Sequence, residues 1–219
     1  MKRYAAFAAA RYLFVFLAAG AILYAILSLA PTEPAEVILA KPAIYLYPQE
    51  ETEIFVNVEL AQGRFTATEP RLGHGWRVTA QPDGTLTDQS GRSWPYLFWE
   101  ADCPAQFDFS QGFVVPGGQV QEFLDRSLAE LGLSRREAAD FMEFWLPQLE
   151  ENPYNLVSFQ QRAYTDLARL DIDPAPDCLI RVFMAWKPLD EPTDIPPQTL
   201  QAPVRQGFTA VEWGGSRVE

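Results

Sequence analysis

Side chains suited to metal binding and nucleophilic catalysis are scarce in this sequence. Its 219 residues include one histidine, His74, and two cysteines, and they form no cluster with the spacing of a zinc site. Nucleophile elbows, phosphate-binding glycine loops, dinucleotide fingerprints and metalloprotease helices are also missing. The sequence therefore predicts no metal and no cofactor. His74, set between two glycines, is expected in a turn.

Basic residues are also few. Lys and Arg number 17 against 29 Asp and Glu, and three of the basic residues (Lys2, Arg3 and Arg11) belong to the first thirty residues, which contain no acid. The rest of the chain carries 14 basic and 29 acidic residues. Such a balance repels nucleic-acid phosphates and anionic lipid headgroups, so we expect no nucleic-acid partner.

One long apolar run stands near the N-terminus. Residues 12–30 are nineteen residues without a charge, and as a helix they would span about 28 Å, which matches the hydrocarbon core of a bilayer. The basic residues all precede the run, which predicts a cytoplasmic N-terminus and a domain outside the cytoplasm. We interpret residues 1–30 as an uncleaved membrane anchor, because the apolar run is longer than the hydrophobic region of a signal peptide, which has about 7 to 15 residues. The alternative is a cleaved signal peptide and a secreted domain.

Residues 31–40 contain two prolines and two acids and are predicted to form a spacer. The globular domain is then expected over residues 41–219. Alternation of apolar and polar residues predicts half-buried strands at its start, and the turn residues at 82–84 and 88–91 predict a meander. These expected strands cover residues 43–47, 53–60, 76–80 and 96–100.

The middle of the chain changes to a helical period. Apolar residues from Val120 to Leu131 have helical spacing and are followed by Gly132. A second helix is expected from Ser134, which can form a capping box with Glu137, up to Pro147. Strand patterns then return, and a proline-rich surface crossing is predicted at 188–203. The later strands are expected at 156–159, 162–172, 180–186 and 208–213.

This order predicts an α+β domain: a mostly antiparallel β-sheet with an inserted helical hairpin, preceded by one N-terminal transmembrane helix.

Two glutamates beside tryptophans are the catalytic candidates. Glu100 follows Trp99, and Glu212 precedes Trp213. If the carboxyls face each other across a groove lined by both indoles, they would suit a glycan, either bound by aromatic stacking or hydrolysed by a carboxylate pair. The alternative is that they are ordinary solvated glutamates at strand ends, with which a base (Lys41, Arg181 or Lys187) could pair.

Tyr45 and Tyr47 are candidate binding residues. They alternate with Ile44 and Leu46 along one predicted strand, and on the face away from the core they could form a recognition surface. Tyrosines on a strand can equally serve cross-strand packing.

The two cysteines can form a disulfide if the domain is exported. Cys103 and Cys178 both lie in proline-containing, turn-like stretches, and the space outside the cytoplasm permits pairing. The alternative is a pair of reduced core thiols. The acids at 171, 173 and 177 resemble a calcium loop but lack its central glycine and closing glutamate, which favours a proline-stiffened loop.

Four segments resemble those of a family of bacterial cell-surface or secreted proteins. They are KPAIYLYP (41–48), NPYNLVSFQ (152–160), IRVFMAWKPLD (180–190) and GFTAVEWGG (207–215), and the resemblance covers nearly all of the chain after Ala40. It implies an exported domain behind an export segment or spacer. It implies no activity and assigns no catalytic residue.

The sequence therefore favours a non-enzymatic extracytoplasmic module, tethered to the membrane by its N-terminal helix, that binds or supports a cell-envelope glycan or protein. A hydrolase of envelope glycans acting through Glu100 and Glu212 is the alternative. A third reading is a structural partner of a membrane complex. The binding module and the hydrolase can be distinguished by whether the carboxyls of Glu100 and Glu212 lie in one pocket.

Overall fold

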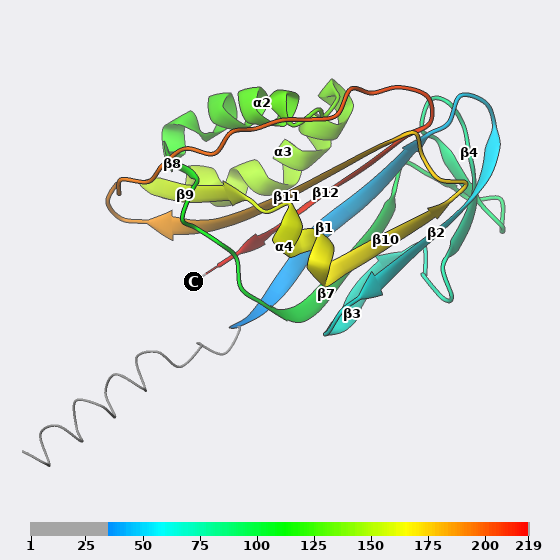
Figure 1. Ribbon diagram of the computed structural model, residues 1–219, viewed down its shortest axis with the longest axis horizontal. Coiled ribbons are helices and arrows are strands. Elements are labelled where there is room, and N and C mark those ends of the chain that lie inside the picture. The colour runs from blue at the N-terminus through cyan, green and yellow to red at the C-terminus, as the bar shows by residue number, and fades with distance from the viewer. Residues whose placement is uncertain (1–34, 219) are drawn as a thin grey trace, which may run out of the picture. The chain divides into compact units, whose positions relative to one another are not determined.

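The computed structural model describes residues 35–218, which form two sheets and a set of short and medium helices (Figure 1). The larger sheet has seven strands in the order β3-β7-β1-β12-β11-β9-β8. All of its neighbours are antiparallel except β11 and β12, which run parallel. Its strands are β3 (Arg64–Glu69), β7 (Leu97–Ala105), β1 (Ala35–Tyr47), β12 (Thr209–Arg217), β11 (Cys178–Leu189), β9 (Tyr154–Phe159) and β8 (Phe113–Pro116).

The smaller sheet is antiparallel throughout and has the order β10-β2-β4-β5-β6. The predicted meander turns are present, because Gly84 and Gly91 adopt the positive φ that closes each tight turn. The strands are β10 (Ala168–Asp173), β2 (Thr52–Leu60), β4 (Trp76–Ala80), β5 (Leu86–Asp88) and β6 (Ser93–Trp94).

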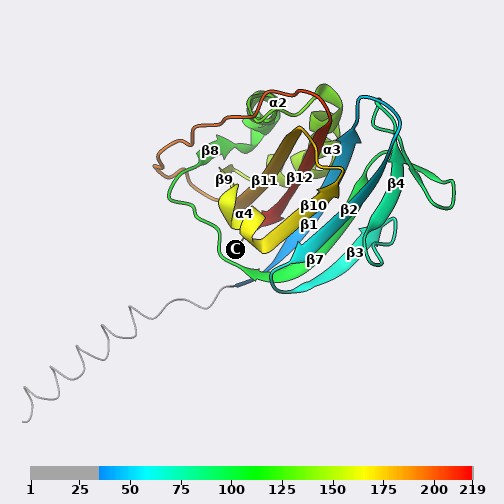
Figure 2. The ribbon, with the colours of Figure 1, turned by 45° about the vertical axis from the view of Figure 1, so that its right-hand side comes forward.

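The helices and the smaller sheet cover opposite faces of the larger sheet. Helices α2 (Val120–Glu130) and α3 (Arg135–Glu150), with the short 3₁₀ helix η1 (Gly117–Gln119) before them, pack on one face and share a core with β1, β11 and β12. The smaller sheet packs on the other face, where its apolar residues join those of β7. Figure 2 shows the three layers from the side. The α+β class is therefore confirmed, with a β-rich, mixed sheet at its centre.

Strand β1 shows why both faces of the larger sheet are apolar. Ile44 and Leu46 join the core beneath the smaller sheet, whereas Ala43 and Tyr45 join the core beneath the helices, and all four are fully buried. A central strand covered on both sides needs apolar residues on both faces. The expectation that one face of this strand is solvent-exposed is therefore wrong.

The helical hairpin was predicted correctly, because its signals are local. Ser134 accepts a hydrogen bond from the Glu137 amide, and the Glu137 carboxylate accepts one from Ser134, which completes the capping box of α3. Gly132 ends the preceding turn at φ 87°. The end of α3 differs from the prediction, since the helix continues through Pro147 to Glu150.

Two boundaries predicted from the sequence are wrong. Residues 35–40, expected in the spacer, form the first half of β1 and pair with β7. Residues 162–167, expected in a strand, form helix α4 (Arg162–Leu167), and only the following β10 is extended. Short apolar segments carry no decisive period, so tertiary packing decides their conformation. Strands β3, β5, β6 and β8 lie outside every residue range predicted as a strand.

No helix within residues 35–218 has the length and hydrophobicity needed to cross a membrane. The predicted anchor at residues 1–30 lies outside the described residues.

Candidate functional site

The structure separates the two candidate glutamates. Along β7 the odd-numbered residues, Trp99 among them, are buried beneath the smaller sheet, so Glu100 projects from the opposite face. Glu212, by contrast, lies on the same face as Trp99 and accepts a hydrogen bond from its Nε1 at 3.1 Å. The two carboxyls are therefore on opposite faces of one sheet. They do not form the carboxylate pair of a glycosidase.

Glu100 has a structural environment on the helix face. Its Oε1 accepts a hydrogen bond from the backbone N–H of Lys41 at 3.3 Å. Lys41 adopts a φ of 59° at the irregularity in β1, and its ammonium lies over the rings of Phe98 and Tyr96 at 4.8 and 5.3 Å. The carboxylate thus supports a strained turn of the strand.

Glu212 is fully buried and paired with a base. Arg181, on the neighbouring strand β11, donates from Nε to Glu212 Oε2 at 2.6 Å, and the two side chains are 10% and 0% exposed. Because its side chain is fully enclosed, the Glu212 carboxyl cannot reach a substrate as a proton-donating acid must. The pairing with Arg181 named in the alternative interpretation is therefore confirmed, but Glu212 is buried in the middle of β12 rather than solvated at a strand end.

Tyr164 of α4 closes this buried cluster. Its ring lies 4.6 Å from the Arg181 guanidinium carbon and stacks on Phe183 at 4.3 Å. Burial, and then the nearby charge of Glu212, raise the pKa of Tyr164 well above its usual value. Burial alone would lower the pKa of Arg181, but the Glu212 carboxylate outweighs it and the net shift is upward. The Arg181 guanidinium therefore stays charged over the physiological pH range.

The four aromatic candidates are core residues. Trp99, Trp213 and Tyr45 are fully buried, and the two indoles lie on opposite faces of the larger sheet. Tyr45 donates to Asp140 on α3 at 2.8 Å and lies parallel to the half-buried ring of Tyr47 at 6.4 Å. Cross-strand and helix packing, rather than an exposed recognition surface, is what these residues provide.

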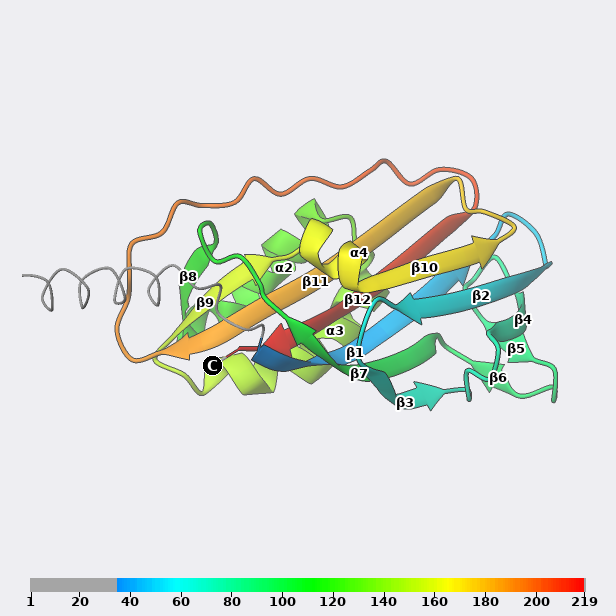
Figure 3. The same cartoon turned by 60° about the horizontal axis from the view of Figure 1, so that its bottom comes forward.

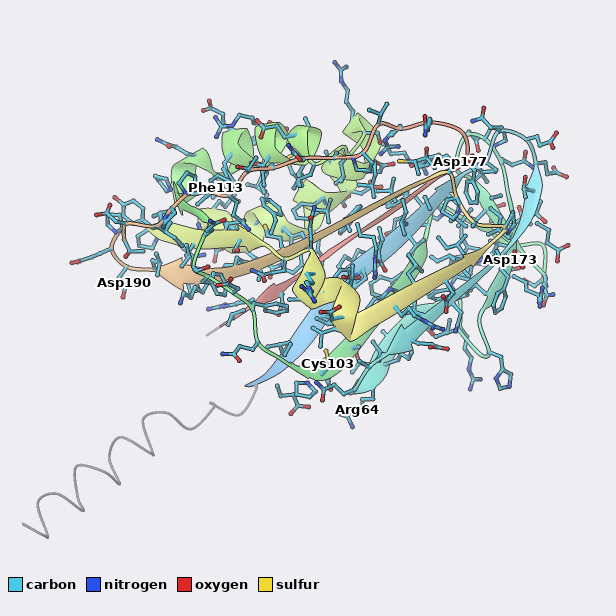
Figure 4. The ribbon with its side chains drawn as sticks, in the orientation of Figure 1. Arg64, Cys103, Phe113, Asp173, Asp177 and Asp190 are labelled. Carbon is cyan, nitrogen blue, oxygen red and sulfur yellow. The ribbon has the colours of Figure 1, made fainter. Side chains whose placement is uncertain are left out.

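The cysteines are free and far apart. Both cysteines are free, and β1 gives their positions along the sheet. Cys103 is the strand neighbour of Val37, near the start of β1. Thr209 on β12 is the neighbour of both Cys178 and Tyr47, so Cys178 lies near the end of β1. Ten residues of strand separate the two levels by roughly 30 Å, far beyond disulfide reach. Figure 4 shows the same separation between Cys103 and Asp177. The expected disulfide is absent from the structure.

The remaining weak candidates bring no ligands together. His74 is exposed on the loop before β4. Asp171 pairs with Arg169 on β10, and Asp177 accepts from the Phe208 amide. Within residues 35–218 no three His, Cys, Asp or Glu side chains are placed to hold a metal ion.

A pocket beside β11 is the site that sequence reasoning missed. Its volume is about 410 Å³, and it lies along the first half of β11, between α4 and the coil 190–208 that leads to β12. Figure 3 shows this coil running from the end of β11 back to the start of β12. Arg162 and Arg181 line the pocket, and no Asp or Glu does. The other lining residues are Leu131, Gln161, Thr165, Leu179, Ile180, Val182, Gln201 and Pro203.

A second pocket of about 420 Å³ adjoins the first and shares Gln161 and Arg162 with it. We call the two together the β11 groove. The only aromatic residue lining it is Phe159, which is 6% exposed. No signal in the sequence marks this groove, because α4 was predicted as a strand and its residues come from distant segments.

Comparisons with known proteins give limited information. No protein-family model matches the chain, and no solved structure matches it. Among curated proteins, one from Butyrivibrio fibrisolvens described as "Uncharacterized protein in bglA 3'region" is similar to this chain, with 45% identity over 65 residues. The match covers 28% of this chain and 66% of that protein.

Proposed function

We propose that this chain is a membrane-anchored, non-enzymatic module outside the cytoplasm, and that it binds an anionic cell-envelope component in the β11 groove. The observation that carries the proposal is the charge of the pocket beside β11. Arg162 and Arg181 line it and no carboxylate does, although acidic residues outnumber basic ones by 29 to 17 in the whole chain. Arg181 is paired with Glu212 and Asp108 lines the adjoining pocket, so Arg162 is the exposed, uncompensated charge of the groove.

The state of the two arginines supports an anionic ligand. Arg181 uses Nε for Glu212, and its Nη2 is buried away from the pocket, so Arg181 adds positive charge beneath the pocket and no free donor. Arg162 is 94% exposed and has only a long contact of 3.7 Å with Asp166, an exposed pair of the kind that contributes little. The Arg162 guanidinium therefore has donors left for a carboxylate or phosphate oxygen.

The placement of the glutamates supports binding rather than hydrolysis. Glu100 and Glu212 lie on opposite faces of the larger sheet, and Glu212 is neutralised by Arg181. A hydrolytic carboxylate pair needs both groups beside one substrate. The two glutamates therefore do not form a hydrolytic pair.

The membrane anchor and the location outside the cytoplasm rest on the sequence. The uncharged run at residues 12–30 has the length of a membrane span, and the basic residues before it favour a cytoplasmic N-terminus. The resemblance to exported bacterial proteins supports the same location.

The proposal can be tested with the full chain in lipid nanodiscs. We expect it to co-sediment with purified, insoluble cell-envelope material, and we expect Arg162→Glu to reduce the bound fraction. Arg71→Glu is the matched control, because Arg71 is also exposed but belongs to the loop before β4. Equal binding by the wild type and Arg162→Glu would contradict the proposal, and so would no binding at all.

A further inference from the structure

The first half of β11 has an unpaired edge. Residues 178–186 pair with β12, but pairing with β9 covers only residues 184–189. Residues 178–183 therefore have a strand neighbour on one side only among the described residues. The chain leaves the other side at Gln160, whose amide donates to the Phe183 carbonyl at 2.8 Å, and turns away into α4.

The direction of the backbone groups along this edge follows from two hydrogen bonds. The Cys178 N–H donates to the Phe208 carbonyl, on the β12 side of the strand. The Phe183 carbonyl accepts from the Gln160 N–H, on the opposite side. Successive residues of a strand direct their backbone groups to alternate sides. Leu179 and Arg181 therefore direct both N–H and C=O into the pocket, where they have no partner among the described residues.

The side chains around this edge match an extended peptide better than a sugar. Leu179 is one of the few exposed large apolar residues among those described, at 39%, and Gln161, before α4, and Gln201, in the coil before β12, also line the pocket. The β11 groove offers no exposed aromatic face, which sugar stacking would need. Main-chain pairing along an edge is, in contrast, a common way to bind a peptide.

We infer that the β11 groove takes an extended acidic peptide segment, which adds to β11 as a strand along Leu179–Phe183 and directs a carboxylate to Arg162. The inference rests on the proposed function, since it names the ligand class of the same groove. The free backbone edge fixes the peptide in register, and the exposed Arg162 guanidinium selects an acidic residue. Without a ligand, the unpaired edge of β11 could form a sheet with a strand of another chain.

The test uses the full chain in nanodiscs and a fluorescent peptide of about seven residues, long enough to span Leu179–Phe183. The peptide alternates threonine and valine and has one central glutamate. We expect saturable binding by anisotropy. Methylating alternate peptide nitrogens, which removes the donors that face β11, should weaken binding on the order of ten-fold or more. Replacing the glutamate by lysine should weaken it as well.

Two variants at one position separate the backbone from the side chain. Leu179→Pro removes the outward N–H without touching the ladder to β12 and should weaken binding, whereas Leu179→Ala keeps that N–H and should bind more tightly than Leu179→Pro. If Leu179→Pro does not fold, the methylated peptide still decides the question. Equal affinity for the methylated and parent peptides would overturn the inference.

Failure of the inference is distinguishable from failure of the proposed function. If the peptide does not bind but inorganic polyphosphate does, and Arg162→Glu abolishes that binding, the groove holds anions and the peptide inference is overturned. If neither probe binds, both are overturned.

Discussion

At the scale of single residues, the buried pair of Arg181 and Glu212 connects the fold with the candidate site. The sequence indicated both members, because Arg181 was one of the bases expected near Glu212. It did not indicate that Glu100 would lie on the other face of the sheet. That depends on how β7 and β12 are each aligned with β1, whose register shifts at an irregularity. The ion pair of Glu212 with a base could thus be predicted from the sequence, whereas the sheet face on which each glutamate lies could not.

Replacing Glu212 should destabilise the protein strongly. Glu212→Gln leaves the Arg181 charge buried without a counter-charge, which costs about 3–5 kcal/mol and should lower Tm by roughly 10 °C. Glu100→Gln is the control, because an amide oxygen can still accept from Lys41, so its Tm should change little. Thermal unfolding of both variants measures the difference. Equal shifts would contradict the assignment of Glu212 as half of a buried ion pair.

Cys103 should make the protein sensitive to alkali. Burial, with a smaller effect of Asp102, raises the pKa of its thiol from 9.0 to about 11. Because the unfolded thiol ionises first, the contribution to stability is complete below pH 9 and is lost as the pH rises through 11. The slope is at most about 1.4 kcal/mol per pH unit. Urea unfolding at pH 8 to 11 should show this slope in the wild type and a shallower one in Cys103→Ala; identical slopes would refute it.

At the scale of elements, local signals were read correctly and non-local ones were not. The capping box and Gly132 fixed the hairpin of α2 and α3 in advance, because these interactions span a few residues. The pairing of β1 with β12 joins opposite ends of the domain, and no local pattern encodes it. Helix α4 has only six residues, too few for its period to be recognised, and the groove that it lines was missed with it.

The cap of α3 gives a prediction at this scale. Ser134→Ala removes the acceptor of the Glu137 amide and should cost about 0.5–2 kcal/mol of stability. Ser134→Asp should restore most of it, because aspartate caps as well as serine and suits the helix N-terminus. Urea unfolding of the three proteins is the measurement. Loss of stability in both variants would mean that Ser134 acts through something other than its cap.

At the scale of the whole molecule, the chain combines a predicted membrane anchor with a domain in which the unpaired edge of β11 lines a pocket. The free thiols are compatible with either side of a membrane, so they give no information on location. The acidic surface disfavours nucleic acid, and it makes the two groove arginines a local exception.

Protease treatment of intact cells tests the predicted topology. If residues 12–30 span the membrane with the N-terminus inside, added protease should degrade the domain before lysis. A cytosolic marker protein must stay intact in the same sample. Survival of the domain until lysis would contradict the proposed location.

Hydrogen exchange at β11 tests the central claim, that the edge of this strand is the binding site, most directly. In the free full chain the amides of Leu179 and Arg181 should exchange rapidly, and those of Ile180 and Val182, which face β12, should be protected. Adding the acidic peptide should protect Leu179 and Arg181. Slow exchange of these two amides in the free chain, or no change on saturation with peptide, would contradict the account.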